Sequence, residues 1–187
     1  MTQARILGGL TMVAVFALDQ ASKFAILHGF GAAGEPPRFL TPFLDLVLIW
    51  NHGISFSLFP QDTSVGIWLL LGFTLVATAL LSVWLWFARA PLVGLGLGAI
   101  IGGAIGNGCD RLAYGAVVDF LDLHAFGRHF FVFNVADAAI NIGVALLLFD
   151  GLFGRSGEQR PAPLAGPSGG DALPVSRKRA SGAGDRP

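Results

Sequence analysis

Four long apolar segments constrain the fold of this chain more than any other feature. They cover about residues 6–27, 64–88, 92–109 and 131–153. A helix of about 20 residues crosses the roughly 30 Å hydrocarbon core of a bilayer, and these segments are of that order. Charged residues make up only 13% of the chain, about half the ~25% of a soluble domain. We therefore expect an all-α membrane protein with four transmembrane helices rather than a water-soluble enzyme.

Glycine recurs every fourth residue in the third segment, at Gly94, Gly98, Gly102 and Gly106. This spacing places a stripe of small residues along one face of a helix. Such a stripe lets a neighbouring membrane helix approach closely.

The charges of the chain are balanced overall but not along its length. Twelve Lys and Arg oppose twelve Asp and Glu, so there is no basic field for nucleic acid. Residues 1–154 carry six basic and nine acidic side chains, a net charge of −3, whereas residues 155–187 carry six and three, a net charge of +3. We expect a membrane domain over 1–154 and a disordered, basic, cytoplasmic tail over 155–187. A single cysteine, Cys109, excludes an intrachain disulfide and a cysteine metal cluster.

The connections between the segments predict the topology. The turn of residues 89–91 contains Arg89, which places it and both termini in the cytoplasm by the positive-inside rule. The longer connections, about 28–63 and 110–130, then lie on the outer side. Residues 43–50, 117–123 and 129–133 read as strands, and we expect them to form a small extracytoplasmic β-sheet. The first segment could instead be a cleaved signal peptide, but Asp19 and Lys23 interrupt its apolar run.

Polar side chains inside the apolar segments are the strongest pointers to function. A charged residue at the centre of a membrane helix costs about 2.5–3.5 kcal/mol and needs a partner, a wet cavity or a task. Asp19 and Lys23 have the i, i+4 spacing of a helical ion pair. They could simply neutralise each other, or they could form a polar anchor that reaches a site near the outer surface.

Further polar groups gather at the outer ends of the last two segments. Asn107, Asp110 and Arg111 share one face if the third helix continues that far, although an interfacial arginine can also merely snorkel. Asn134, Asp137 and Asn141 form a polar face on the fourth segment. Asp119, within the apolar run 117–120, is either a solvated strand residue or a chemical group.

Several chemistries can be weighed against these residues. The four histidines never take the His-Glu-x-x-His spacing of a zinc protease. Ser22 beside Lys23, or Ser55 and Ser57 near His52, show no oriented serine and base. Paired carboxylates remain, because two aspartates that share a proton can act as base and acid near neutral pH. Topology can bring Asp119 and Asp137 together.

Four sequence boxes resemble the lipoprotein signal peptidase family, the bacterial signal peptidase II. They are DQASK at 19–23, NHGISF at 51–56, GGAIGNGCDRLAYGAVVDF at 102–120 and FNVADAAI at 133–140, about 40 positions in the family's order. The third and fourth boxes are highly specific. The second departs from the commonest pattern, with Ile54-Ser55 where two small alanines are usual.

The resemblance implies an aspartic endopeptidase of the bacterial inner membrane. It would cleave the signal peptide of a prolipoprotein just before the diacylglyceryl-modified cysteine, near the outer leaflet. By position, Asp119 and Asp137 are the implied catalytic dyad. The implied supporting residues are Asp19, Lys23, Asn51, Gly103, Asn107, Asp110, Arg111 and Asn134. The implied partners are the prolipoprotein and membrane lipids. We expect a monomer without metal or cofactor.

Two other classes remain alternatives. The first is a metal-dependent lipid transferase, because the run Gly115-x-x-x-Asp119-x-x-Asp122 is one residue shorter than the second half of the CDP-alcohol phosphotransferase motif. Residues 106–110 also miss the Gly-x-Gly-Asp pattern of presenilin-like proteases by one inserted residue. A metal-dependent lipid transferase would require magnesium. A proton-coupled carrier, with Asp19, Lys23 and Asp137 as a relay, would show pH-driven solute flux and no peptide cleavage.

Overall fold

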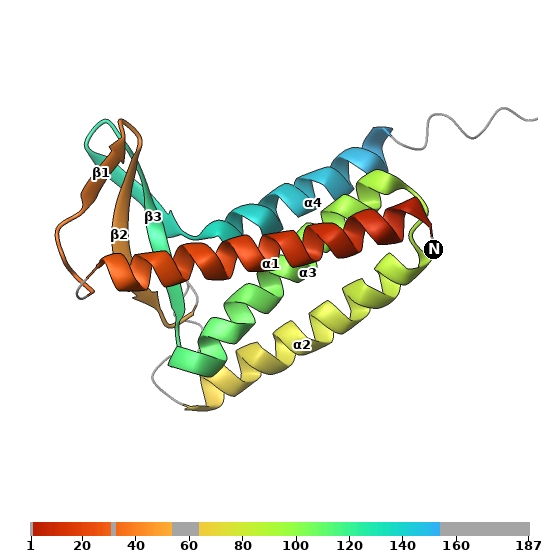
Figure 1. Ribbon diagram of the computed structural model, residues 1–187, viewed down its shortest axis with the longest axis horizontal. Helices are drawn as coiled ribbons and strands as arrows, with labels where there is room; N and C mark the ends of the chain where they lie inside the picture. The colour runs from red at the N-terminus through yellow and green to blue at the C-terminus, as the bar shows by residue number, and fades with distance from the viewer. Residues whose placement is uncertain (1, 31–32, 54–63, 154–187) are drawn as a thin grey trace, which may run out of the picture. The chain divides into compact units, whose positions relative to one another are not determined.

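The computed structural model describes residues 2–30, 33–53 and 64–153, which form four long helices and one four-stranded sheet (Figure 1). In chain order the elements are α1 (Gln3–Gly29), β1 (Arg38–Thr41), β2 (Leu44–Asn51), α2 (Ser64–Phe87), α3 (Pro91–Tyr114), β3 (Val117–Ala125), β4 (Arg128–Phe133) and α4 (Val135–Phe153). All four helices are long and apolar enough to cross a membrane. The predicted fold class is confirmed. The tail 155–187 lies outside the described residues.

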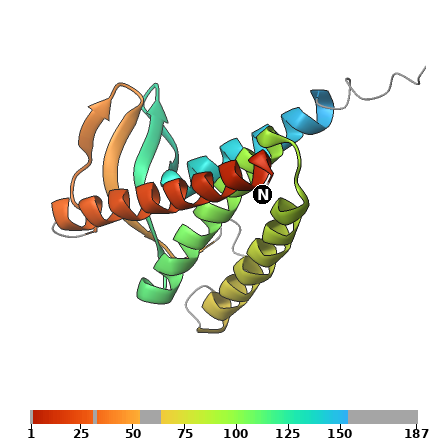
Figure 2. The same cartoon turned by 45° about the vertical axis from the view of Figure 1, so that its right-hand side comes forward.

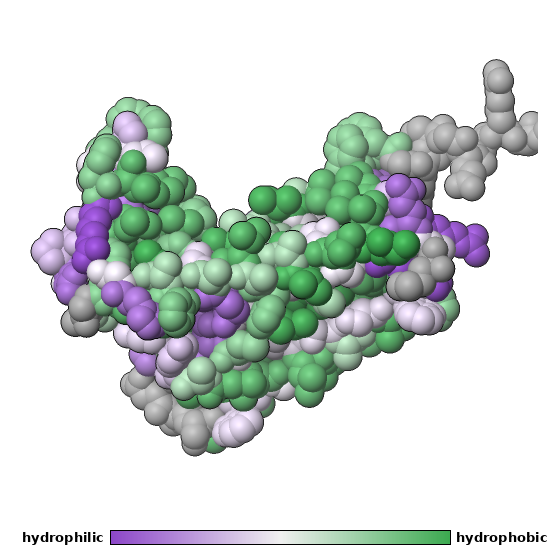
Figure 3. Space-filling model, viewed as in Figure 1, coloured by the Kyte–Doolittle hydropathy of each residue, from purple (hydrophilic) through white to green (hydrophobic). Residues whose placement is uncertain are grey.

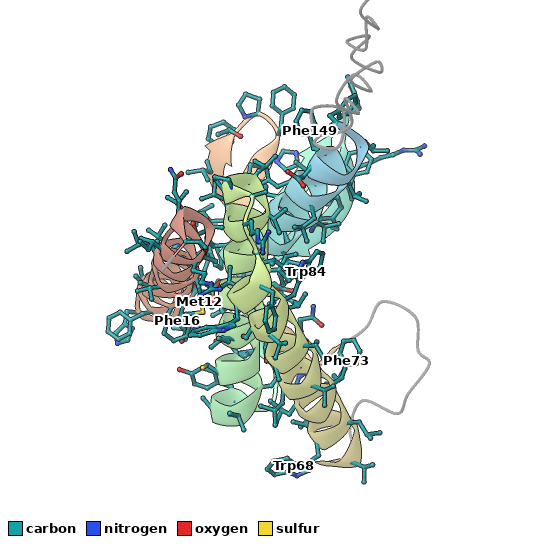
Figure 4. All side chains as sticks on the ribbon, turned by 90° about the vertical axis from the view of Figure 1, so that its right-hand side faces the viewer. Met12, Phe16, Trp68, Phe73, Trp84 and Phe149 are labelled. Carbon is teal, nitrogen blue, oxygen red and sulfur yellow. The ribbon has the colours of Figure 1, made fainter. Side chains whose placement is uncertain are left out.

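Helix α3 is the central helix of the bundle. It packs against α1, α2 and α4 (Figures 1 and 2), and most of its surface is buried, whereas the other three helices are largely exposed. Trp68 and Phe73 project from α2 at the outside of the bundle (Figure 4). Hydrophobic residues also dominate the helical surface in Figure 3. Such a surface is stable only in lipid.

The glycine stripe of α3 lies against the backbone of α1, as predicted. Gly94, Gly98 and Gly102 pack on the main chain of Ala4, Gly8 and Met12, and a Cβ atom at Gly102 would lie 2.5 Å from the Met12 carbonyl oxygen. The contact therefore requires glycine, and it brings the polar residues of both helices together further along.

The sheet lies at one end of the helices, and all its pairings are antiparallel in the order β1-β2-β3-β4. Its first strand was not predicted, because all four residues of β1 are exposed and show no alternation. Strand β3 is the most buried one. Phe30, Leu48 and Val118 form a small core that joins the end of α1 to the sheet.

Two element boundaries differ from the expected ones. Helix α3 continues past 109 to Tyr114, where Gly115 ends it with a left-handed φ of 72° and donates its N–H to the Arg111 carbonyl at 3.1 Å. Helix α4 begins at Val135 rather than at 131, because residues 131 and 133 pair with Leu123 and Leu121 of β3. Asp110 and Arg111 are thus helical residues and not part of a loop.

Candidate active site

The start of α4 is held by a capping arrangement that contains a candidate catalytic residue. Asn134 precedes the helix, and its Oδ1 accepts the N–H of Asp137 at 2.9 Å. The Asp137 carboxylate accepts the N–H of Asn134 in return, at 3.3 Å. Asp19 of α1 accepts a third free N–H, that of Ala136, at 2.9 Å. Three of the donors that a helix start leaves unpaired are thereby satisfied, and Asp137 is fixed in the first turn.

Asp119 lies on β3 and faces the same asparagine. The Asn134 Nδ2 lies 2.7 Å from Asp119 Oδ1, and the Asn51 Nδ2 donates to Asp119 Oδ2 at 2.8 Å. Asp119 is only 2% exposed, so it is not a solvated strand residue. Asn134 therefore touches both carboxylates: its side-chain amide donates to Asp119, and its backbone N–H donates to Asp137.

Burial raises the pKa of Asp119 from its ordinary value of 3.8 to about 6. The negative charge of Asp137 acts in the same direction, while the hydrogen bonds from Asn51 and Asn134 oppose it. An aspartate with this pKa is a carboxyl group that can hold a proton close to neutral pH.

Asn107 of α3 connects the aspartates to the interior of the bundle. Its Nδ2 donates to Asp137 Oδ1 at 2.8 Å. Its Oδ1 accepts from Lys23 Nζ at 2.9 Å and from Asn134 Nδ2 at 3.1 Å. The orientation of the Asn107 amide is thus fixed at both ends by residues of two other elements.

A buried ionic cluster lies behind Asn107. Lys23 Nζ is 2.8 Å from a carboxylate oxygen of Asp19 and 2.8 Å from one of Asp110. All three side chains are almost fully buried. The same Asp110 oxygen accepts the N–H of Val118 at 3.1 Å, next to Asp119. Asp19 and Lys23 therefore form the ion pair expected from their spacing. Lys23 also contacts Asp110 and Asn107, so the pair is connected to the candidate site as well.

Gln20 belongs to this cluster and was not predicted. Its Nε2 lies within hydrogen-bond distance of Asp19 Oδ2 at 3.2 Å, the Gly106 carbonyl at 3.3 Å and Asp110 Oδ1 at 3.1 Å. Glutamine is uncharged, so the free-energy cost of placing it in a membrane helix is smaller than for aspartate or lysine and did not mark it as a site residue. The only sequence signal was its position directly after Asp19 in the first box.

Two glycines of α3 make room for these contacts. A Cβ at Gly103 would lie 2.6 Å from the Ala136 carbonyl oxygen and 2.9 Å from the Ile140 side chain. A Cβ at Gly106 would collide with the Asp19 carboxylate. Gly103 thus sets how closely the first turn of α4 approaches α3. Gly106 leaves space for the Asp19 carboxylate, which accepts the Ala136 N–H at the start of α4.

The chain matches a known protein family over most of its length. The family model described as Signal peptidase (SPase) II matches residues 11–153. The chain belongs to the signal peptidase II family. It is 49% identical over 146 residues to the lipoprotein signal peptidase of Beijerinckia indica subsp. indica, covering 78% of this chain and 87% of that protein. It is 47% identical to that of Rhodopseudomonas palustris strain TIE-1, covering 86% of this chain and all of the relative.

The fold of this signal peptidase II chain is also found among solved structures. One, a bacterial membrane enzyme determined by the in meso method at 2.3 Å resolution, is 25% identical and superposes with a TM-score of 0.71 over 83% of this chain and 93% of the other. A second, at 1.9 Å resolution, is 26% identical with a TM-score of 0.68, covering 78% and 92%.

All ten residues predicted for the site of this signal peptidase II lie within one connected group. Arg111 is linked to this group through Asn107, because its Nη1 donates to the Asn107 backbone carbonyl of the same helix at 3.4 Å. Residues 54–56 of the second box lie outside the described residues. Within the described part of the chain, no three His, Cys, Asp or Glu side chains gather as metal ligands.

Two hollows lie beside the polar group of this signal peptidase II, and one of them is lined by Asp137. A pocket of about 610 Å³ lies between β4 and α4 beside Asp137, lined by Asn51, Phe131, Val132, Phe133, Ala138, Ile140 and Asn141. Figure 3 shows the surface hollowed between the sheet and α4. A second crevice of about 340 Å³ between α2, α3 and α4 reaches Asn107 and Arg111 along apolar walls. The first hollow thus opens beside Asp137, and the second reaches Asn107, which donates to Asp137.

Proposed function

We propose that this chain is an aspartic endopeptidase that removes signal peptides from diacylglyceryl-modified prolipoproteins, cleaving just before the lipidated cysteine. Its family makes it a signal peptidase of type II, and lipoprotein signal peptidase is the name of its relatives. The single observation that carries the mechanism is the position of Asn134, which contacts Asp119 and Asp137 at once. Both carboxyl groups then belong to one catalytic unit.

The two aspartates have different surroundings, and this supports different roles. Asp119, with a pKa of about 6, holds a proton in the resting dyad. Asp137 accepts N–H groups from Asn134 and Asn107 and lies in the first turn of α4, where the helix dipole favours negative charge. It acts as the general base.

The reaction then needs no covalent intermediate. Asp137 takes a proton from a water molecule as the water oxygen attacks the scissile carbonyl carbon, and Asp119 donates its proton to the carbonyl oxygen. When the tetrahedral intermediate collapses, the proton on Asp137 passes to the leaving nitrogen and the C–N bond breaks. Asp119 recovers its proton from the hydroxyl of the intermediate. Water and a peptide bond yield a carboxylic acid and an amine.

The placement of the site suits a lipid-anchored substrate. The chain is a multi-pass protein of the bacterial inner membrane, and the aspartates lie where the helices meet the sheet. We place this end at the outer leaflet and both termini in the cytoplasm, because Arg5 and Arg89 lie at the opposite end. Phe131, Phe133 and Ile140 supply apolar contacts beside Asp137. The ten residues of the site all belong to one subunit, so the proposed chemistry requires no second copy.

The experiment uses purified protein in lipid vesicles with a diacylglyceryl-modified precursor and its unlipidated counterpart. We expect cleavage of the lipidated precursor only, and complete loss with Asp119→Asn and with Asp137→Asn at normal protein levels. Asp122→Asn is the matched control, since Asp122 is also a buried aspartate of β3 but its carboxylate pairs with His129 at 2.6 Å. This control should cleave normally. Cleavage by either dyad variant would overturn the mechanism, and equal cleavage of both precursors would overturn the selectivity.

A further inference from the structure

Two hairpin turns at one end of the sheet each present a phenylalanine to the outside. The turn between β1 and β2 contains Phe43, and the turn between β3 and β4 contains Phe126. The turns are neighbours, since the His124 N–H donates to the Phe43 carbonyl at 3.0 Å. The side chain of Phe43 is 61% exposed, and that of Phe126 is fully exposed. We call residues 41–44 and 125–128 the hairpin tips.

Phe126 occupies a position that folding alone would not give to an aromatic residue. Its φ is 53°, the left-handed region, and Gly127 follows with a φ of 72°. Positive φ at both central residues is the pattern of a two-residue type I′ turn, in which Asn-Gly is strongly favoured. A bulky residue in this region is an outlier. The side chain is fully exposed, so a compensating partner would lie outside the described residues.

The surroundings of the hairpin tips indicate which partner this is. Phe39, Leu40 and Phe130 are also exposed, and Figure 3 shows hydrophobic residues gathered at the end of the sheet where the turns lie. An exposed cation, Arg128, lies in the second tip, whereas Arg38 begins β1 away from the turn and pairs with Glu35. Aromatic rings with nearby arginines are typical of the boundary between lipid headgroups and acyl chains.

The position of the tips relative to the helices leads to the same partner. In Figures 1 and 2 both hairpins extend sideways beyond the helices, at the end of the bundle where the sheet lies. The bilayer that surrounds the four apolar helices continues beneath this overhang. We propose that the hairpin tips insert Phe43 and Phe126 into the headgroup region of the adjacent leaflet, while Arg128 contacts lipid phosphates.

The first test places a polarity-sensitive nitrobenzoxadiazole label at Phe126→Cys, in the full chain carrying Cys109→Ala and reconstituted in phosphatidylethanolamine and phosphatidylglycerol vesicles. We expect blue-shifted emission that is quenched by lipids with nitroxides near the headgroup and protected from aqueous iodide. The same label at Ala33→Cys, in the exposed loop before β1, should be quenched by iodide. Iodide quenching at position 126 would overturn the proposal, and so would protection from both quenchers, which would mean a protein partner.

The second test separates insertion from folding. Phe126→Asn supplies the residue that the turn favours, so we expect unfolding at the same or a higher temperature than the parent. With an Asn at 126 and the label moved to Phe43→Cys, the lipid-nitroxide quenching should fall at least about threefold, because one of two anchors is lost. Unchanged quenching, with the hairpin intact, would show that Phe126 does not hold the tips in the lipid.

Discussion

Asn134 and Asp137 exchange two hydrogen bonds across the first turn of α4, one from each residue's backbone N–H to the other's side chain. This exchange uses the Asn134 oxygen, so its Nδ2 is left to point toward Asp119. A motif that usually only begins a helix therefore also sets the distance between the two carboxyl groups.

Asn134→Ser separates the capping of α4 from the hydrogen bond that Asn134 donates to Asp119. Serine is a good N-cap residue but has no amide to donate to Asp119. We expect kcat to fall by about 10²-fold, as for a misplaced catalytic group, with KM nearly unchanged. Asn134→Ala should lose the same activity and about 1 kcal/mol of stability in addition. Steady-state kinetics and unfolding in mixed micelles measure both effects, and a serine variant with the parent kcat would contradict this account of Asn134.

Loss of Lys23 is predicted to destabilise the fold much more than loss of the exposed Arg38. Lys23→Met leaves Asp19 and Asp110 buried without their cation, and removing one partner of a buried ionic group costs about 3–5 kcal/mol. Arg38→Met is the control, because the Arg38 pair with Glu35 is half exposed and such pairs contribute about 1 kcal/mol or less. Equal losses in reversible unfolding would contradict the prediction.

Gly103→Ala tests whether close helix packing positions the dyad. The added methyl group meets the Ala136 carbonyl and Ile140, so α4 must move away and carry Asp137 with it. We expect processing to fall by 10-fold or more, up to about 10²-fold, with helical circular dichroism unchanged. Gly9→Ala has open space around its Cβ and should be neutral or stabilise by up to about 1 kcal/mol. Normal processing by the Gly103 variant would show that this contact does not set the site.

The raised pKa of Asp119 predicts a pH dependence of activity. The active form carries the proton on Asp119, so kcat/KM should fall as pH rises through about 6. Because the two aspartates interact, the measured value belongs to the pair. A rate profile between about pH 4 and pH 8 checks this limb. A rate that keeps rising through pH 8 would exclude Asp119 as the protonated member.

The Asp119 carboxyl group also makes the stability of the folded chain depend on pH. Its pKa is higher in the folded chain than the ordinary 3.8, so the folded state binds the proton more tightly. This contribution to stability is fully present below about pH 4 and is lost as pH rises through about 6. Unfolding measured across this range should become easier toward neutral pH in the parent, and less so in Asp119→Asn. An identical pH dependence in both proteins would contradict the burial of this group.

The number of membrane helices and the residues of the site could be predicted because both depend on polarity. An apolar run of 20 residues or a carboxyl group within one is visible without coordinates. The ends of α3 and α4 were less accessible. The continuation of α3 to Tyr114 depends on the left-handed Gly115 that ends it, and the start of α4 depends on residues 131–133 pairing with β3. These are tertiary outcomes that composition does not show.

Contacts made by glutamine and histidine side chains with distant aspartates were the hardest to foresee. Gln20 reaches Asp110 from another helix, and its importance follows only once α1 and α3 are side by side. The pairs of His124 with Asp45 and of His129 with Asp122 depend likewise on strand register. By contrast, the stripe from Gly94 to Gly106 predicted its own contact, because only a close neighbour explains such a spacing.

The cluster of Lys23, Asp19 and Asp110 also has a consequence for how the chain enters the membrane. Helix α1 carries both Asp19 and Lys23, which neutralise each other. Helix α3 adds the carboxylate of Asp110, and its cationic partner, Lys23, lies on α1, which is synthesised earlier. Each of these groups is costly in lipid, and the cost is removed only when the two helices meet along their glycine contact. The first and third helices therefore have to associate within the bilayer as α3 arrives, which makes their pairing the step on which assembly of the active enzyme depends.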